Sequence, residues 1–207
     1  PFIIAGVVGL HIWALHVPGN NNPLGIDVKS PQDTVPFHPY YTVKDSVGIC
    51  AFLAFWAFLV FFVPNLLADP NNFIRANPLQ TPNDIVPEWY FLPFYAILRS
   101  IPNKLLGVCA MFGYIGTLFV LPWLDTSRVR SAFFRPWYKW WFWVLVIDCI
   151  ALGVVGAHRP EGAWVVIGRI GTLYYFFHFW ILFPVLGIFE RPLPLPASIS
   201  EAVLKKH

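Results

Sequence analysis

The sequence predicts an all-α membrane protein, a transmembrane helix bundle with four complete spans, one truncated N-terminal helix and an interfacial helical loop. Three observations support this: 57% of the 207 residues are hydrophobic, only 12% are charged, and mean hydropathy is +0.59. The charged fraction is about half that of a typical globular chain, which excludes a water-soluble enzyme. A dispersed net charge of +3 also argues against nucleic acid as a partner, so the lipid bilayer is the expected environment.

Residues 1–16 (PFIIAGVVGLHIWALH) are apolar apart from two histidines. They lack the basic start and small-residue cleavage site of a secretory signal. At about 1.5 Å per residue they extend roughly 24 Å, less than the roughly 30 Å of a hydrocarbon core. We therefore interpret them as the second part of a truncated transmembrane helix.

Intervals without acidic or basic residues predict three complete spans, 46–68, 105–124 and 170–189, each at least 20 residues long. A fourth predicted span, 140–158, is interrupted only by Asp148. Tryptophans 137, 140, 141 and 143 lie at its start, where an interfacial aromatic belt is expected. Cys50, Cys109 and Cys149 lie inside apolar stretches without metal-site spacing, so we predict that they are small core residues.

The connections between spans predict the orientation of the chain. The first and third connections and the tail carry nine basic residues against five on the other side, and those nine are Lys29, Lys44, Arg128, Arg130, Arg135, Lys139, Arg191, Lys205 and Lys206. The positive-inside rule then puts the connection 17–45 on the cytoplasmic or matrix side and 69–104 on the opposite face. Within the latter, 85–98 (IVPEWYFLPFYAIL) is apolar but interrupted by proline. We expect it to fold onto the bilayer surface as an interfacial helix pair.

Two histidines near the start are candidate site residues. His11 is a lone imidazole in an apolar helix, where it must either hydrogen-bond to a neighbouring helix or bind a ligand such as haem iron. Spacing alone does not distinguish these roles. His16 lies roughly 140° further around the helix, so the two cannot share one ligand. It is an interfacial histidine or a site residue, and the stretch from Gly19 to Pro23 after it is expected to end the helix.

Three charged residues outside the spans also have two possible roles. Asp45, with Lys44, precedes an uncharged run, so it either caps a helix or belongs to an ionisable pair that exchanges protons with a ligand. Glu88, between Pro87 and Trp89, either handles protons in an apolar loop or reaches water or Arg99.

Two further ionisable residues, Asp148 and His178, lie inside predicted spans. For both we predict packing and hydrogen bonding to neighbouring residues.

A specific motif then adds a family resemblance. The segment PEWY at 87–90, followed by FLPFYAILRS, resembles the PEWY segment of cytochrome b, the membrane core of ubiquinol-cytochrome c reductase. Other matches follow in the family's order, namely HIW at 11–13, GNNNP at 19–23, PFHPYY at 36–41 with KD at 44–45, and DTSR at 125–128. The resemblance extends over essentially the whole chain and corresponds to the C-terminal half of that family, from within its fourth helix to the end of its eighth.

The resemblance implies three regions: a truncated helix with a haem ligand at 1–16, a cytoplasmic-side loop with quinone-reduction residues at 17–45, and a C-terminal region with four transmembrane helices and the PEWY loop at 46–207. It implies that His11 is an axial ligand of the high-potential haem b. The complete family protein holds two haem b groups, and the other ligands lie outside this sequence. This chain alone therefore cannot complete either haem site and is not expected to be active alone.

The resemblance also implies two sites for ubiquinone and ubiquinol. His16, Asn20, Lys44 and Asp45 resemble the quinone-reduction site, where an imidazole and an acid can supply protons. Glu88 resembles the proton acceptor for quinol oxidation, with Tyr95 as a hydrogen-bonding neighbour. One electron would leave to a Rieske iron-sulfur protein and the other to the low-potential haem.

The implied partners are the Rieske protein, a cytochrome c-type subunit and the missing N-terminal half, in a homodimeric complex of the bacterial inner membrane or, alternatively, the mitochondrial inner membrane. A second interpretation is a haem-free structural subunit of a split cytochrome b from photosynthetic membranes. That subunit starts after the fourth helix, and His11 argues against it. A small transporter would be expected to show paired half-helices or an internal repeat, and we find neither.

Overall fold

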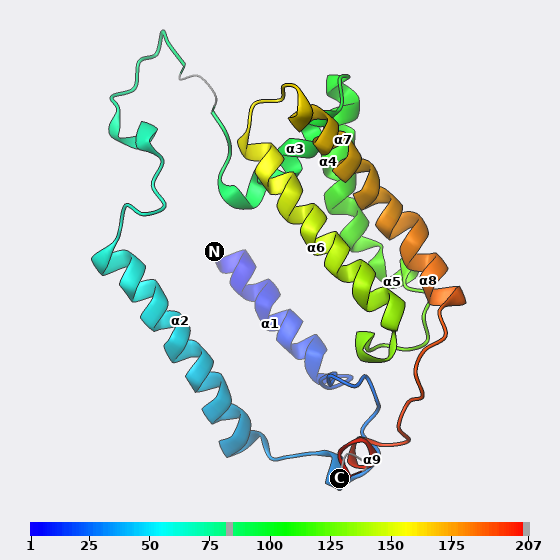
Figure 1. Cartoon of the computed structure of the whole chain (residues 1–207). Coiled ribbons are helices and arrows are strands. Elements are labelled where there is room, and N and C mark those ends of the chain that lie inside the picture. The colour runs from blue at the N-terminus through cyan, green and yellow to red at the C-terminus, as the bar shows by residue number, and fades with distance from the viewer. Residues whose placement is uncertain (82–84, 205–207) are drawn as a thin grey trace. The chain divides into compact units, whose positions relative to one another are not determined.

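The structure is a computed structural model that describes residues 1–81 and 85–204, and every regular element in these residues is a helix (Figure 1). Lys205 and Lys206, counted above among the basic residues, lie outside that part. The α-helices are α1 (Phe2–His16), α2 (Thr42–Phe62), α3 (Leu92–Ser100), α4 (Lys104–Phe119), α5 (Leu121–Leu124), α6 (Pro136–Ala157), α7 (Ala163–Phe177), α8 (Phe183–Phe189) and α9 (Ile199–Leu204). Short helical turns occupy Pro31–Asp33, Phe37–Tyr41, Pro70–Phe73, Trp89–Phe91, Ala132–Phe134 and His178–Leu182.

The chain divides into two compact units. One consists of Pro1–Asp27 with Val86–His207, and the other is Val28–Ile85. Among the α-helices of the described residues, the first unit contains all except α2.

Helix α2 in the second unit is shifted from its predicted bounds of 46–68. It begins at Thr42 and ends at Phe62, where Val63 leaves the helical conformation. Pro64 explains this end, because a proline disfavours helical geometry at the residue before it. Asp45 lies in the first turn and the cap position belongs to Tyr41, so the capping role considered for Asp45 is wrong.

The core of the first unit joins α3, α4, α6 and α7 with the turn and helix that follow α7. Its buried residues are Ala96, Ile97, Tyr114, Leu152, Val155, Tyr175, Phe179 and Phe183. The rings of Tyr114 and Tyr175 stack with centres 3.8 Å apart, and the Tyr175 hydroxyl donates to the Tyr114 carbonyl at 3.0 Å. This aromatic centre supports the short helix α3, which carries Tyr95.

Within residues 1–81 and 85–204, three helical segments are long and apolar enough to cross a membrane: Pro31–Phe62, which contains α2, then Pro136–Ala157 and Ala163–Phe189. The predicted span 105–124 instead forms the 16-residue α4 and, after a break at Val120, the short α5. Pro122 lies in the first turn of α5, a position that proline tolerates. The count of four complete spans therefore stays a prediction.

The last predicted span begins earlier than expected. Helix α7 starts at Ala163, seven residues before the predicted start at 170, so Arg169 lies inside the helix, which continues through the turn His178–Leu182 into α8. The predicted interfacial helix pair at 85–98 is one short turn, Trp89–Phe91, followed by the nine-residue α3. Its location at a bilayer surface stays a prediction.

The cysteines differ in part from expectation. All three are free, and Cys149 is half-buried, with its sulfur 3.7 Å from the Tyr114 hydroxyl. Cys50 and Cys109 are exposed on the surface of this chain. The prediction of core positions is therefore wrong for these two, because the apolar helix faces that carry them are not covered by other residues of the chain.

Three glycines let α3 approach its neighbours closely. A β-carbon built on Gly156 of α6 would lie 2.1 Å from the Leu92 carbonyl oxygen, and one on Gly107 of α4 would lie 2.5 Å from the Leu98 carbonyl oxygen. On α7, a β-carbon at Gly168 would lie 2.4 Å from the Ser100 hydroxyl oxygen. Each helix that packs on α3 thus presents a glycine at the contact, as small residues do where membrane helices pack closely.

We expect the substitution Gly156→Ala to destabilise the packing of α3, because the obstructing atoms are backbone and cannot rotate away. Overpacking of this kind costs about 1–3 kcal/mol. Gly153→Ala is the matched control, since its β-carbon would lie 3.8 Å from the Pro93 side chain, an ordinary contact. Thermal denaturation of the purified complex measures both, and equal midpoints would contradict the close approach.

Candidate functional site

The PEWY loop places Glu88 immediately before the turn Trp89–Phe91. The Glu88 carbonyl accepts from the Phe91 amide at 2.8 Å, while its side chain is exposed within this chain. The aromatic residues after it connect the loop to the core, since Phe91 contacts Phe94 at 5.9 Å between ring centres and Phe94 contacts Tyr114 at 4.8 Å. The Glu88 carboxylate is thus exposed on a loop whose aromatic residues pack against the core of the helix bundle.

Arg99 fixes α3 to the end of α6. Its Nη2 atom donates to the carbonyl oxygens of Gly156 and His158, both at 2.8 Å, and of Val155 at 3.3 Å. A cation is favourable at a helix carboxyl end, where carbonyl groups lack helical partners. The Tyr95 ring centre lies 4.1 Å from the guanidinium carbon. The ion pairs found in the described ranges do not join Glu88 to Arg99, so the alternative pairing is not formed.

Arg169 of α7 secures the carboxyl end of α3. Its Nε donates to the Ser100 carbonyl at 3.0 Å, and the buried Ser100 hydroxyl donates to the Ala96 carbonyl at 2.6 Å. Helix α3 is therefore held by a glycine contact at each neighbour and by a cation at its carboxyl end. These contacts fix the position of the half-buried Tyr95.

Helix α1 carries both sequence-predicted histidines. His11 is exposed, and no hydrogen bond or ion pair of its side chain is found in the described part of the chain. His16 ends the helix, and its Nδ1 lies 2.7 Å from the Ile12 carbonyl oxygen. Gly19, with φ of +81°, follows the helix and its amide donates to the Leu15 carbonyl at 3.1 Å, which agrees with the predicted end.

The four residues expected at a quinone-reduction site are divided between the two units. His16 and the exposed Asn20 belong to the first unit, whereas Lys44 and Asp45 belong to the second. Lys44 Nζ lies 5.9 Å from the Tyr41 ring centre, and the Asp45 side chain is exposed. The structure therefore describes each half and does not establish one shared pocket.

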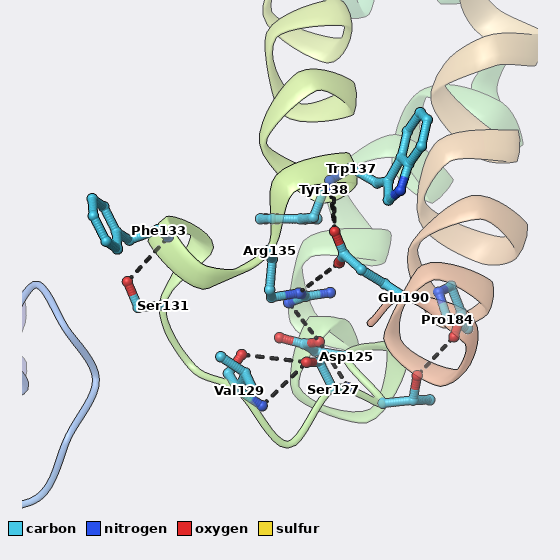
Figure 2. A network of polar contacts seen from close by, with 11 residues as sticks. Asp125, Ser127, Val129, Ser131, Phe133, Arg135, Trp137, Tyr138, Pro184 and Glu190 are labelled. Carbon is cyan, nitrogen blue, oxygen red and sulfur yellow. Dashed lines mark hydrogen bonds and ion pairs between the residues drawn. The ribbon is translucent and has the colours of Figure 1, made fainter. Parts of the chain in front are cut away.

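A buried ionic network was not expected from the sequence. Arg135, only 2% exposed, lies 3.3 Å from both Asp125 and Glu190. Figure 2 shows these two ion pairs. The Glu190 carboxylate also accepts from the amides of Trp137 at 2.6 Å and Tyr138 at 3.0 Å, which satisfies the exposed amides at the start of α6. One feature of the sequence could have predicted this network. Asp125 and Glu190 directly follow the predicted spans 105–124 and 170–189, which end on the same side of the membrane.

The ionisable residues inside the helices have unequal surroundings. His178 is 2% exposed, and its Nδ1 shares a hydrogen bond with the Tyr174 hydroxyl at 3.1 Å, in agreement with the prediction of a satisfied histidine. Asp148 faces Gly171 of α7, but its Oδ2 has no hydrogen-bond partner within the described residues. Only the histidine has the expected hydrogen bond.

The metal-binding side chains of the chain determine which metal ion or cofactor it could bind. Groups of three or more histidine, cysteine or acidic side chains that could bind a metal ion are not found in the described ranges. The free imidazole of His11 suits one axial position of a haem iron, because such a ligand must present an uncommitted ring nitrogen. The chain fits haem as a contributor of one ligand.

Together these features define an all-helical membrane protein with polar and ionic contacts concentrated at the helix ends. The family model described as cytochrome b (C-terminal)/b6/petD matches residues 75–176. Cytochrome b of Rhodospirillum rubrum is 60% identical over 203 residues, 98% of this chain and 50% of that protein. Cytochrome b of Rickettsia bellii is 57% identical over 199 residues, 96% of this chain and 50% of its own length.

A solved structure gives the same result. A chain of a structure described as a hyperthermophilic respiratory Complex III superposes with a TM-score of 0.86 at 37% identity, covering 92% of this chain and 49% of that one. The chain belongs to the cytochrome b family and corresponds to its C-terminal half. It spans about half the length of the curated relatives it matches.

Proposed function

We propose that this chain is the C-terminal part of the cytochrome b subunit of a quinol-cytochrome c oxidoreductase. In that role it takes part in carrying electrons from ubiquinol through b-type haem to ubiquinone, coupled to proton translocation. The observation that carries the proposal is the 60% identity to a bacterial cytochrome b over 98% of the chain, which includes the PEWY segment. Activity requires the complete protein.

His11 would be a ligand of the iron of the high-potential haem b. When bound, the haem accepts and donates single electrons, and the protein contributes orientation and electrostatics. The exposed and uncommitted imidazole on an apolar helix supports this role. Neither haem site is complete within the chain, so the remaining ligands would come from the N-terminal half.

The proposed quinone-reduction site consists of His16, Asn20, Lys44 and Asp45. An imidazole and a carboxylic acid can deliver the two protons that quinone takes up on reduction, while an amide and an ammonium group can hydrogen-bond its oxygens. The exposure of His16, Asn20 and Asp45 within this chain supports the proposal, because all three side chains are available to a ligand.

The proposed quinol-oxidation site uses Glu88 as proton acceptor. Its carboxylate is exposed within this chain, and the aromatic residues described above keep the backbone beneath it in place. Tyr95 would hydrogen-bond in the same pocket, with its ring oriented by Arg99. These residues would remove protons and position the quinol, which is the part of the reaction that the protein supplies.

The partners proposed for the complete protein are the Rieske iron-sulfur protein, a cytochrome c-type subunit, the N-terminal half of cytochrome b and a second copy of the complex. The bacterial inner membrane is the proposed location, in line with the bacterial relatives. A second candidate, a haem-free subunit of a split cytochrome b, is favoured by one observation: the family model also describes b6/petD proteins, and its match begins at residue 75.

A dithionite-minus-ferricyanide difference spectrum of the purified membrane complex, with the intact mass of the b-type subunit, distinguishes the two candidates. We expect two b-type haems and a subunit roughly twice the length of this chain, because the curated relatives are about that long. A complex without haem bound to a subunit of this chain's own mass would overturn the main proposal and favour the haem-free subunit.

A further inference from the structure

We propose that Arg130 and Ser131, on the connection between α5 and α6, form a platform that positions the loop after α1 for quinone reduction. This inference rests on the proposed quinone-reduction site, since the loop follows His16 and contains Asn20. Arg130 and Ser131 are positioning residues in it, because they contact the loop rather than the quinone.

The platform contacts the loop at three alternate residues, Pro23, Gly25 and Asp27. The Ser131 hydroxyl donates to the Pro23 carbonyl at 2.6 Å, and Arg130 Nη2 forms an ion pair with Asp27. Between these, Gly25 has φ of +65°, and a β-carbon on it would lie 3.0 Å from the Arg130 β-carbon and 3.1 Å from the Ser131 amide nitrogen. The loop is thus held by a hydrogen bond, a close backbone contact and an ion pair.

The loop itself is internally bonded, so that displacement at one point is transmitted along it. The Asn22 side-chain oxygen accepts from the amides of Leu24 at 3.1 Å and Ile26 at 3.4 Å, and its amide group donates to the Ile26 carbonyl at 2.6 Å. Ile26 is buried, with 8% exposure. Asn20 lies two residues before this bonded segment, and His16 lies at the helix end just before it.

The platform is in turn attached to the helix bundle. The Ser131 hydroxyl also accepts from the Phe133 amide at 3.2 Å, which begins the turn Ala132–Phe134, and Phe134 is buried. The next residue, Arg135, belongs to the buried network of Figure 2. A continuous set of contacts therefore joins the start of α6 to the loop that carries Asn20.

The ion pair is exposed on both sides, with 55% of the Arg130 and 75% of the Asp27 side chain accessible. Exposed pairs contribute little to folding stability, and salt screens them. Its loss should therefore change the placement of the loop, and with it quinone binding, without unfolding the chain. Charge reversal should act more strongly than neutralisation, because it replaces attraction by repulsion.

The test uses the complete complex in native membrane vesicles and follows the reoxidation of pre-reduced b-type haem by an added short-chain ubiquinone. We expect Arg130→Asp and Asp27→Arg each to raise the KM for that quinone about fivefold, within the range measured for interacting pairs. The maximal rate and the haem spectrum should change little. The double swap, Asp27→Arg with Arg130→Asp, should restore the KM of the parent. The conservative variant Arg130→Lys, which keeps the charge, should leave the KM near the parent value.

Arg128→Asp is the matched control, because it makes the same charge change at an exposed residue of the same connection, whereas the hydrogen bond and the ion pair to the loop come from Ser131 and Arg130. Its KM should stay near that of the parent. His16→Ala serves as the reference for the proposed function. A raised KM for His16→Ala with unchanged values for Arg130→Asp and Asp27→Arg would overturn the platform alone. Unchanged values for all three would instead overturn the quinone-reduction site on which it rests.

Two further results would also count against the platform. The first is a raised KM for both single variants that the double swap does not lower. The second is a response of Arg128→Asp as large as that of Arg130→Asp, which would indicate a general effect of charge. If a reversed variant loses its haem, Arg130→Gln replaces it, with a smaller KM increase expected and an unchanged KM counting against the proposal.

Discussion

Substitution of His11 by alanine in the complete protein is expected to abolish the spectral signal of the high-potential b haem. Its imidazole is the only haem ligand that the proposed function assigns to this chain, and a methyl group offers no donor atom to iron. The low-potential haem, which has no ligand from His11, should keep its signal. A redox titration followed in the haem absorbance bands resolves the two.

The control for His11→Ala is His158→Ala. That imidazole is also exposed, but it stacks on Trp164 and its Nδ1 lies 2.7 Å from the Val154 carbonyl oxygen, so it is already committed. We expect both haem signals to persist in this variant. Added imidazole should partly restore the missing signal of His11→Ala if the haem pocket stays folded. A high-potential haem unaffected by His11→Ala would remove the ligand assignment.

The second large effect is expected for Glu88→Gln, which keeps the shape of the side chain but cannot take up a proton at neutral pH. Quinol oxidation should slow by about 10²-fold or more, the usual contribution of a general base. The haem spectra should stay unchanged, because Glu88 lies on a loop and not at the proposed haem ligand. Steady-state reduction of cytochrome c by ubiquinol measures the rate.

The matched control for this substitution is Glu161→Gln. Glu161 is another exposed acid of the first unit, on the connection before α7, and it is not assigned to either quinone site. Its variant should oxidise quinol at the parent rate. Equal rates for Glu88→Gln and the parent would withdraw the catalytic role of Glu88, whereas a slow Glu161→Gln variant would indicate that surface charge limits the reaction.

The helices could be predicted from the sequence because charges are costly inside a bilayer, so charge-free intervals mark apolar helices. The ends of the helices could not be predicted in this way, because they depend on local backbone conformation, which a count of charges does not describe. Pro64 ends α2 early, and the break at Val120 divides α4 from α5. Arg169 shows that a charged residue can also lie inside a helix. Its side chain donates a hydrogen bond to the Ser100 carbonyl, which satisfies part of its polar group.

The candidate residues of the site could be found because each belongs to a local pattern, such as PEWY around Glu88. The contacts that hold these residues in place could not be predicted, because they join parts of the chain that are distant in sequence. Arg99 bonds to carbonyls 56 to 59 residues away, and Arg135 pairs with Glu190 55 residues away. The exposure of Glu88 could not be predicted either, since the apolar residues around it in the sequence do not cover its side chain in the structure.

The two ends of α6 are held by side chains of opposite charge. Glu190 accepts hydrogen bonds from amides at its start, and Arg99 donates to carbonyls at its end. The 22-residue helix measures about 33 Å at 1.5 Å per residue, close to the thickness of a hydrocarbon core. Piston-like sliding of α6 along the membrane normal would break both attachments at once. A thinner or thicker bilayer is therefore expected to be accommodated by tilting of α6 together with α3 and α8, so that hydrophobic mismatch acts on the bundle as a single rigid body.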